Sequence, residues 1–547
     1  MTSYRREQLH QGIFIGGLAM VAVAMPVSVY FMSVGQLLIA ANWFLQGRFA
    51  EKLRTFRANK PAMVFSAIYL LYVLGFFYSS DKPEALGNLV DKLPILSLVF
   101  FVASSRPVPP GTRKWLLLAF SGSITVLSLI GVGLLLWGEV GDYRELSPFV
   151  SHIRVGLMTA LSIVSLSWMG AGGFYPGRGR QPETGTDVRK ETNRIRGFMA
   201  GGGWRLACFV LAGWHLVYLF MLQSLSGIIA LLAVLMIIGI RTIVRGNKCW
   251  RIISVSALSL LALIIAGLLA WGWTMVNLDH KEDLGQLDSH TAMGNPYQHD
   301  TTSTFRENGK LVYLYIAPDE LREAWEARSG FDYMGNDLRG QELRYTLFRF
   351  LTSKGLRKDA QGLAQLTPGE IEAVEKGIAN VNYLHWPGVL IRIHQSFWEI
   401  SEYRREKKPE GHTLSQRVTF WKAAREAIEK RPWFGWGTGD MLVAMQYGFD
   451  RSGSPLAFRS HMKPHNQYLS LLVLFGVVGL SWFVFAVFYA PFRLRGFSHL
   501  PFLAFFVILF TSMFIDDTLA TQAGLTFFVF FFNVFLFLKE AANTQKP

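Results

Sequence analysis

Long apolar runs constrain this chain more than any other feature of its sequence. Several approach the roughly 20 residues that a helix needs to cross the hydrocarbon core of a bilayer, and 51% of the 547 residues are hydrophobic. The runs predict an all-α polytopic membrane protein, and no cleavage site follows the first run cleanly, so we expect no removed signal peptide. The twelve expected spans are residues 12–27, 29–45, 62–78, 86–103, 115–137, 155–172, 206–222, 225–240, 252–273, 466–489, 500–515 and 518–538.

Lysine and arginine are unevenly distributed between these spans. With the N-terminus inside, the short outside segments hold almost none apart from Lys82, Lys92 and Arg144. This asymmetry follows the positive-inside rule, so both termini are expected in the cytoplasm. The net charge of +15 is then explained by basic cytoplasmic segments beside the lipid bilayer, and no nucleic-acid partner is expected. The two cysteines, Cys208 and Cys249, indicate neither a disulfide framework nor a cysteine metal site.

One segment between the spans, residues 274–465, is much longer than the rest and is expected outside. Thr367 followed by Glu370 is a capping-box signature, and residues 321–329 and 414–430 have amphipathic helical patterns. The segment is therefore expected to be a folded, mostly helical domain. The expected organisation is spans one to nine in residues 1–273, this large loop in 274–465, and the last three spans in 466–547.

Two polar motifs stand close together at the end of this loop. In KRPWFGWGTGD, residues 430–440, the glycines permit a tight turn or a close approach to a ligand, and a plain helix-ending turn is the alternative. His465 and Asn466 then open the tenth span, where they either act on a substrate or serve only as interface and capping residues.

Arginines near the outer rim give a second set of candidates. Arg154 begins the sixth span, and Arg417 lies in the amphipathic segment before the glycine-rich turn. Each either reaches the membrane interface or binds a diphosphate, for which a permanently charged, bidentate guanidinium is suited. The sequence has no evident aspartate-rich metal motif, so we expect neither a metal nor another cofactor. Asp516 and Asp517 are interpreted as caps of the twelfth span.

Together, these motifs resemble the domain shared by O-antigen ligases and O-antigen polymerases. RPWFGWGTG and, after a spacer, HNQYLSLLVLFGVVG match the pattern of that superfamily, and the loop sequence resembles its Bacteroidota branch. The matching residues are Pro432, Phe434, Gly435, Gly437, His465, Asn466, Gly476 and Gly479.

The resemblance implies a function. Enzymes of the ligase branch transfer a glycan from undecaprenyl diphosphate to a hydroxyl of lipid A–core at the periplasmic face of the bacterial inner membrane. Their fold resembles that of GT-C glycosyltransferases, and they are thought to invert the anomeric carbon without a metal. By this resemblance His465 activates the acceptor hydroxyl, and Arg417 and Arg154 bind the leaving diphosphate. Further residues expected to contact substrate are Asn466, Gly435, Gly437, Arg392 and Lys463.

The chain departs from the family pattern at one point. Relatives often carry an arginine in the turn between the seventh and eighth spans, where this chain has QSLSG with Leu225. Arg154 and Arg392 are the candidates to replace that arginine.

Other functions remain open at the level of sequence. A polymerase that joins lipid-linked repeat units, or a protein O-oligosaccharyltransferase, would use the same donor chemistry. A transporter or flippase for lipid-linked sugars would show charges inside spans, broken helices or inverted repeats.

Overall fold

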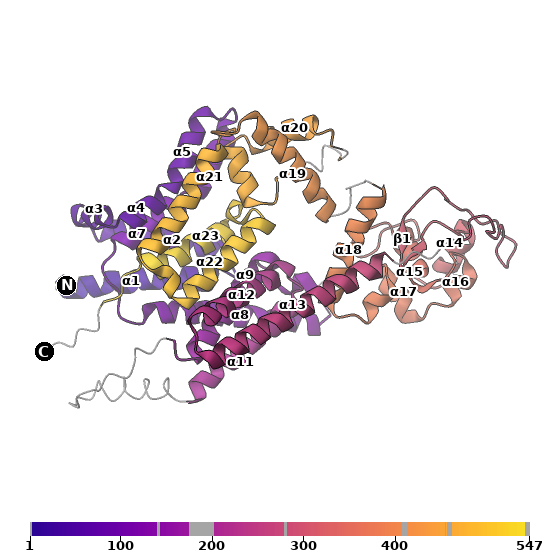
Figure 1. Cartoon of the computed structure of the whole chain (residues 1–547), viewed down its shortest axis with the longest axis horizontal. Coiled ribbons are helices and arrows are strands. Elements are labelled where there is room, and N and C mark those ends of the chain that lie inside the picture. Colours follow the sequence, from indigo (N-terminus) through magenta and orange to yellow (C-terminus); the bar gives the residue numbers. More distant parts are fainter. Residues whose placement is uncertain are drawn as a thin grey trace. The chain divides into compact units, whose positions relative to one another are not determined.

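The structure is a computed structural model that describes residues 3–138, 143–173, 202–277, 282–406, 413–454, 456 and 462–541, and most of these are helical (Figure 1). Among them, eight segments are long and apolar enough to cross a membrane. Shorter apolar helices cover residues 29–45, 500–515 and 522–537. The predicted all-α polytopic fold is confirmed, whereas the number of twelve spans stays a prediction.

Contacts divide the chain into two compact units. The first consists of residues 1–240, 420–454 and 458–547, and the second of residues 241–419 and 455–457. The ninth expected span, α13 (Lys248–Val276), falls in the second unit because it packs against α18 (Gly388–Glu406).

The first unit contains most of the apolar helices. At its centre α9 (His152–Gly170) is packed against α8 (Thr112–Leu136), α11 (Gly202–Met221) and α22 (Leu500–Ile515). Phenylalanines of α22 and α23 (Gln522–Phe532) pack in tilted and edge-to-face pairs in its core. The other elements are α1 (Ser3–Ala24), α2 (Val29–Leu45), α3 (Phe49–Ala58), α4 (Lys60–Ser66), α5 (Ile68–Tyr78), α6 (Lys82–Lys92), α7 (Pro94–Ser104), η1 (Tyr143–Leu146), most of α12 (Leu225–Arg245), α20 (Met441–Arg451), α21 (Gln467–Arg493), η4 (Gly496–Ser498), η5 (Thr518–Ala520), α23 (Gln522–Phe532) and η6 (Asn533–Phe537).

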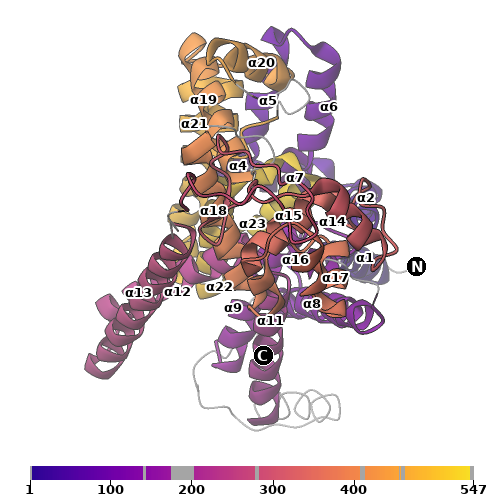
Figure 2. The same cartoon turned by 90° about the vertical axis from the view of Figure 1, so that its right-hand side faces the viewer.

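The second unit contains a small folded domain of short helices, which lie together in Figure 2. Its core surrounds the fully buried Trp325, and Thr367 and Glu370 form the expected capping box. The described part of the large loop therefore contains a folded core, and its regular elements are helices and one two-stranded sheet. Its elements are β1 (Arg306–Glu307), β2 (Lys310–Leu311), α14 (Pro318–Glu326), α15 (Leu343–Lys354), α16 (Ala360–Ala364), α17 (Pro368–Glu375), η2 (Val381–Leu384) and the start of α19 (Thr413–Lys430).

Candidate active site

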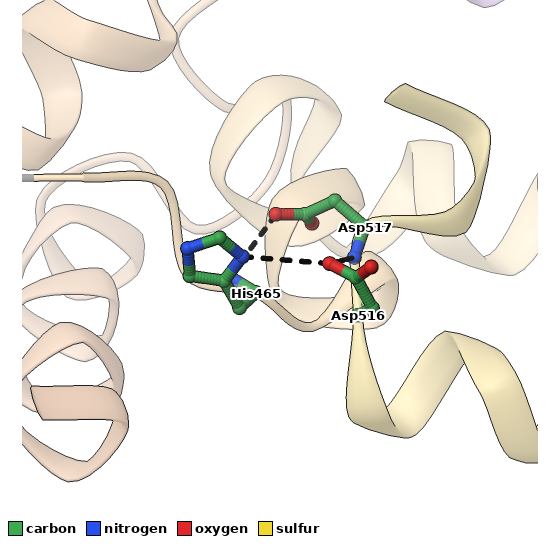
Figure 3. Close-up of side chains that lie close together, drawn as sticks. All are labelled: His465, Asp516 and Asp517. Carbon is green, nitrogen blue, oxygen red and sulfur yellow. Dashed lines mark hydrogen bonds and ion pairs between the residues drawn. The ribbon is translucent and has the colours of Figure 1, made fainter. Parts of the chain in front are cut away.

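Three segments that are far apart in the sequence meet at the start of α21. Arg154 comes from the first turn of α9, and His465 lies two residues before α21 begins. Asp516 and Asp517 form the turn between α22 and η5, and both carboxylates face His465 (Figure 3). All four residues belong to the first unit.

His465 is fixed through both its backbone and its ring. Its φ is +50°, a left-handed conformation that is uncommon for a residue other than glycine. Its backbone N–H donates to Oδ2 of Asp517 at 3.0 Å, and Nδ1 lies 3.4 Å from Oδ1 of Asp516. The ring also lies beside that of Phe420, with 5.9 Å between centroids. Nε2 makes no hydrogen bond to any described residue, and 31% of the side chain is exposed.

Arg154 is a buried cation held by the same turn. Nη2 lies 3.0 Å from Oδ2 of Asp516 and 3.3 Å from the Asp517 carbonyl oxygen, and Nε donates to Oγ1 of Thr521 at 3.2 Å. Only 5% of the residue is exposed. Nη1 is buried and has no hydrogen-bond partner among the described residues. A buried guanidinium with a remaining donor is costly unless an anion or water satisfies it.

The two aspartates have opposite pKa shifts. Burial opposes ionisation of Asp516, but His465, the charge of Arg154 and the Asp517 N–H outweigh it and lower its pKa to about 2. Burial raises the pKa of Asp517, and the Asp516 charge adds to that effect, against hydrogen bonds from Ser470 and the His465 backbone. Asp516 is therefore the ionised partner that faces both His465 and Arg154.

The geometry also allows a cation at this turn. One atom from each of His465, Asp516 and Asp517 lies within 4.8 Å of the others, and nitrogen and carboxylate oxygen are ligands that divalent metals use. However, Arg154 already supplies a positive charge to Asp516. These residues could hold a metal, but the site does not require one for charge balance.

The residues around this turn clarify two of the capping expectations. Asn466 is the N-cap of α21, since its Oδ1 accepts from the backbone N–H groups of Tyr468 and Leu469. The interpretation of Asp516 and Asp517 as caps of the last apolar helix is wrong, because Thr521 caps α23. Sequence reasoning noticed the acidic pair but missed its proximity to His465 and Arg154, because that proximity depends on the tertiary fold.

The glycine-rich turn packs into a break in α21. Gly476 has φ +63° and ψ −168°, which interrupts the helix. Across the break, Val477 N–H donates to the Pro432 carbonyl oxygen at 2.8 Å, and Trp436 N–H donates to that of Val473 at 2.9 Å. A Cβ atom on Gly435 would lie 2.4 Å from the Leu474 carbonyl carbon. Backbone hydrogen bonds therefore join the two halves of the sequence motif.

The same turn also packs against the end of α5. Gly437 N–H donates to the Leu474 carbonyl oxygen at 2.9 Å, and a Cβ atom there would lie 2.5 Å from Ser79 Oγ. Both carboxylate oxygens of Asp440 accept from the Ser80 N–H, at 3.0 and 2.8 Å. Gly435 and Gly437 thus lie at backbone contacts within the first unit, and their expected substrate contacts stay predictions.

The remaining candidates lie outside this cluster. Lys463 is partly buried and interacts electrostatically with Lys92 of α6. Arg392 and Arg417 belong to the second unit, where both guanidinium charges act on Glu399. Burial raises the pKa of Glu399, against the Leu414 N–H and these two arginines. The structure thus groups Arg392 with Arg417, and separately Arg154 with His465.

The fold and this cluster define a polytopic, all-α membrane protein with polar groups gathered at one end of its helices. Residues 377–484 match the sequence model of a family described as O-antigen ligase. This range contains the glycine-rich turn, His465 and the break in α21. This segment is therefore similar to the domain shared by O-antigen ligases and polymerases, which suggests a membrane enzyme of glycosyl transfer. No curated protein matches the chain.

Proposed function

We propose that this protein is an O-antigen ligase: it transfers a glycan from undecaprenyl diphosphate to a hydroxyl of lipid A–core. The observation that carries the proposal is the His465–Asp516–Arg154 cluster at the start of α21. It joins a histidine with a free ring nitrogen to a buried arginine that has a remaining donor.

His465 is proposed as the base that receives the proton of the acceptor hydroxyl. Ionised Asp516 beside Nδ1 favours the tautomer with the proton on Nδ1, which leaves Nε2 as an acceptor. The acceptor oxygen bonds to the anomeric carbon as the bond to the diphosphate breaks, and its proton passes to Nε2. Attack from the face opposite the leaving group inverts the anomeric centre.

Arginines are proposed to stabilise the negative charge that develops on the diphosphate. The turn in which the family places an arginine packs on α9 just after Arg154, since a Cβ atom on Gly156 would lie 2.3 Å from Ser224 Oγ. This supports Arg154 as the replacement. By the family resemblance, Arg417 and Arg392 are also proposed to bind the diphosphate, and the charges of both act on Glu399.

The proposed location is the bacterial inner membrane, with this cluster facing the periplasm and both termini in the cytoplasm. The support is the distribution of basic residues along the sequence. The polyprenyl tail of the donor would then lie in the bilayer. Its diphosphate would lie at the membrane surface, beside the arginines that are proposed to bind it.

A transporter of lipid-linked sugars is the second candidate, and the broken helix α21 is the observation that favours it. In transporters the freed backbone groups of such helices bind the substrate or ion. Here Pro432 and Trp433 accept from the N–H groups of Val477 and Val478 after the break. This use of the backbone within the protein favours the enzyme.

The test is complementation of a strain that lacks this gene, read by lipopolysaccharide gels and by analysis of lipid-linked glycans. For a ligase we expect capped lipopolysaccharide to be restored by the wild type and lost with His465→Ala, with long polymer left on the lipid carrier. Single repeat units on core in the deletion strain would instead identify a polymerase. Glycan missing from proteins would identify a protein O-oligosaccharyltransferase.

A further inference from the structure

A second polar site lies at the other end of the first unit. The N-terminal part of α2 is near the candidate active site, because Gln36 bonds to Thr526 of α23 at 3.1 Å and Ser33 bonds to Gln522. Its C-terminal end, about 18 Å from Ser33 along the helix, borders a hollow of about 330 Å³. Residues of α1, the end of α2 and the segment after α7 line this hollow.

A second hollow of about 180 Å³ adjoins it through the shared residues Gln46, Ser105, Arg106 and Pro107. Cations outnumber carboxylates in the combined lining, which contains Arg48, Lys52, Arg106 and Lys539 against Glu7 and Glu51. Glu7 lies 2.8 Å from Arg48 and 2.9 Å from Arg106, and Arg106 also lies 3.5 Å from Glu51, so two carboxylates only partly compensate the four cations.

Lys52 is a buried cation in this lining. It is only 5% exposed, and its Nζ lies 4.4 Å from the centre of the Trp43 ring and donates to the Trp43 carbonyl oxygen. It forms no ion pair with a carboxylate of any described residue. Burial lowers the pKa of Lys52 to about 8. A buried ammonium group with these partners alone is stabilised by an anion beside it.

The hollows are bordered by apolar side chains that point away from the protein core. Phe44, Leu45, Phe49 and Leu53 are all well exposed, with exposed fractions from 39% to 71%. Phe49 and Leu53 are four residues apart on α3 and share one face of this charged helix. A polar, cationic hollow beside an apolar border matches a lipid, whose headgroup is polar and whose tails are not.

We propose that these joined hollows bind the phosphate headgroup of an anionic phospholipid. Lys52 and Arg106 contact the phosphate, and the exposed side chains of α2 and α3 contact the acyl chains. Basic pockets between membrane helices on the cytoplasmic side are suited to such headgroups. The site is independent of the glycan chemistry proposed above.

The test measures the thermal stability of the purified full-length protein in detergent with added phosphatidylglycerol, phosphatidylcholine or inorganic phosphate. We expect phosphatidylglycerol alone to raise the melting temperature, by about 2 °C or more. Lys52→Met and Arg106→Gln should each weaken the apparent affinity for it about fivefold. Arg57→Gln is the matched control, because it removes one charge from exposed α3 surface outside the lining.

Three results would overturn the proposal. One is an equal shift with phosphatidylcholine, which would show a general effect of lipid. Another is an equal shift with inorganic phosphate, which would show a site for a free anion. The third is a failure of the variants to discriminate. Either an undiminished shift in Arg106→Gln or an equal loss in Arg57→Gln would place the lipid elsewhere.

Discussion

At the scale of single residues, one carboxylate links the two functional groups of the candidate site. Asp516 places one oxygen near the His465 ring and the other against the Arg154 guanidinium. A change at Asp516 is therefore expected to alter the orientation of the proposed base and the position of the buried cation together.

We expect Asp516→Asn to lower the transfer rate by roughly tenfold to hundredfold, less than loss of His465, because the imidazole remains but its tautomer is no longer selected. Membranes with matched protein levels and a lipid-linked donor provide the assay. Asp450→Asn, on the exposed end of α20, should leave the rate unchanged. An unaltered rate in Asp516→Asn would remove Asp516 from the mechanism.

Lys358 gives the second unit a defined pH dependence. It is 3% exposed, and burial lowers its pKa from 10.5 to about 7. The unfolded chain thus binds this proton more tightly than the folded one between pH 7 and 10.5, so this residue's penalty is full below pH 7 and disappears as the pH rises. We expect slower proteolysis of this unit at pH 9 than at pH 6.

Lys358→Met should remove most of that difference, whereas Lys376→Met, at an exposed lysine of the same unit, should retain it. Protease digestion of the full chain at both pH values, corrected for protease activity, makes the comparison. The same pH dependence in Lys358→Met would contradict the assignment.

At the scale of elements, the break in α21 explains why the two halves of the family motif occur together. The glycine-rich turn satisfies backbone groups that the break exposes, and the short helical piece before Gly476 carries Asn466 as its cap. The geometry of His465 therefore depends on a contact about ten residues away along the chain.

We expect Gly476→Ala to destabilise the protein by about 2 kcal/mol or more, because only glycine adopts this backbone conformation readily. In addition, the new Cβ atom would lie 2.3 Å from the Trp433 carbonyl carbon. Gly213→Ala is the control, since a Cβ atom on Gly213 meets nothing within 4 Å. Melting temperatures in detergent test the pair, and equal values would contradict the role of the break.

Sequence patterns predict the helices better than they predict where a helix breaks or which helices meet. Apolar runs and the capping box at Thr367 were sufficient for most helices, because both are local signals. The break at Gly476 lies within an uninterrupted apolar run, so hydropathy does not reveal it. Likewise, Arg154 and Asp516 are 362 positions apart in the sequence, and only the packing of α9 against α22 brings them together.

At the scale of the whole molecule, the proposed function depends on sidedness. In the proposed reaction, donor and acceptor meet at the outer face of the inner membrane, so the proposal requires the large loop to lie on that side. The two native cysteines allow a direct test, since Cys249 is exposed and Cys208 is buried.

In intact spheroplasts we expect a membrane-impermeant maleimide to label Asp319→Cys, whose side chain is 88% exposed in the large loop. Cys249, in a basic segment expected in the cytoplasm, should react only after the membrane is opened. Cys208 serves as the internal negative control. Labelling of Cys249 in intact spheroplasts would reverse the proposed topology.

The most direct test of the central claim is the transfer rate of purified His465→Ala, compared with wild type, together with donor binding. We expect the rate to fall by about 10²–10⁴-fold with donor affinity retained, since the base acts on the acceptor hydroxyl. A rate close to that of the wild type would show that His465 only begins a helix, and would contradict the proposed catalytic role.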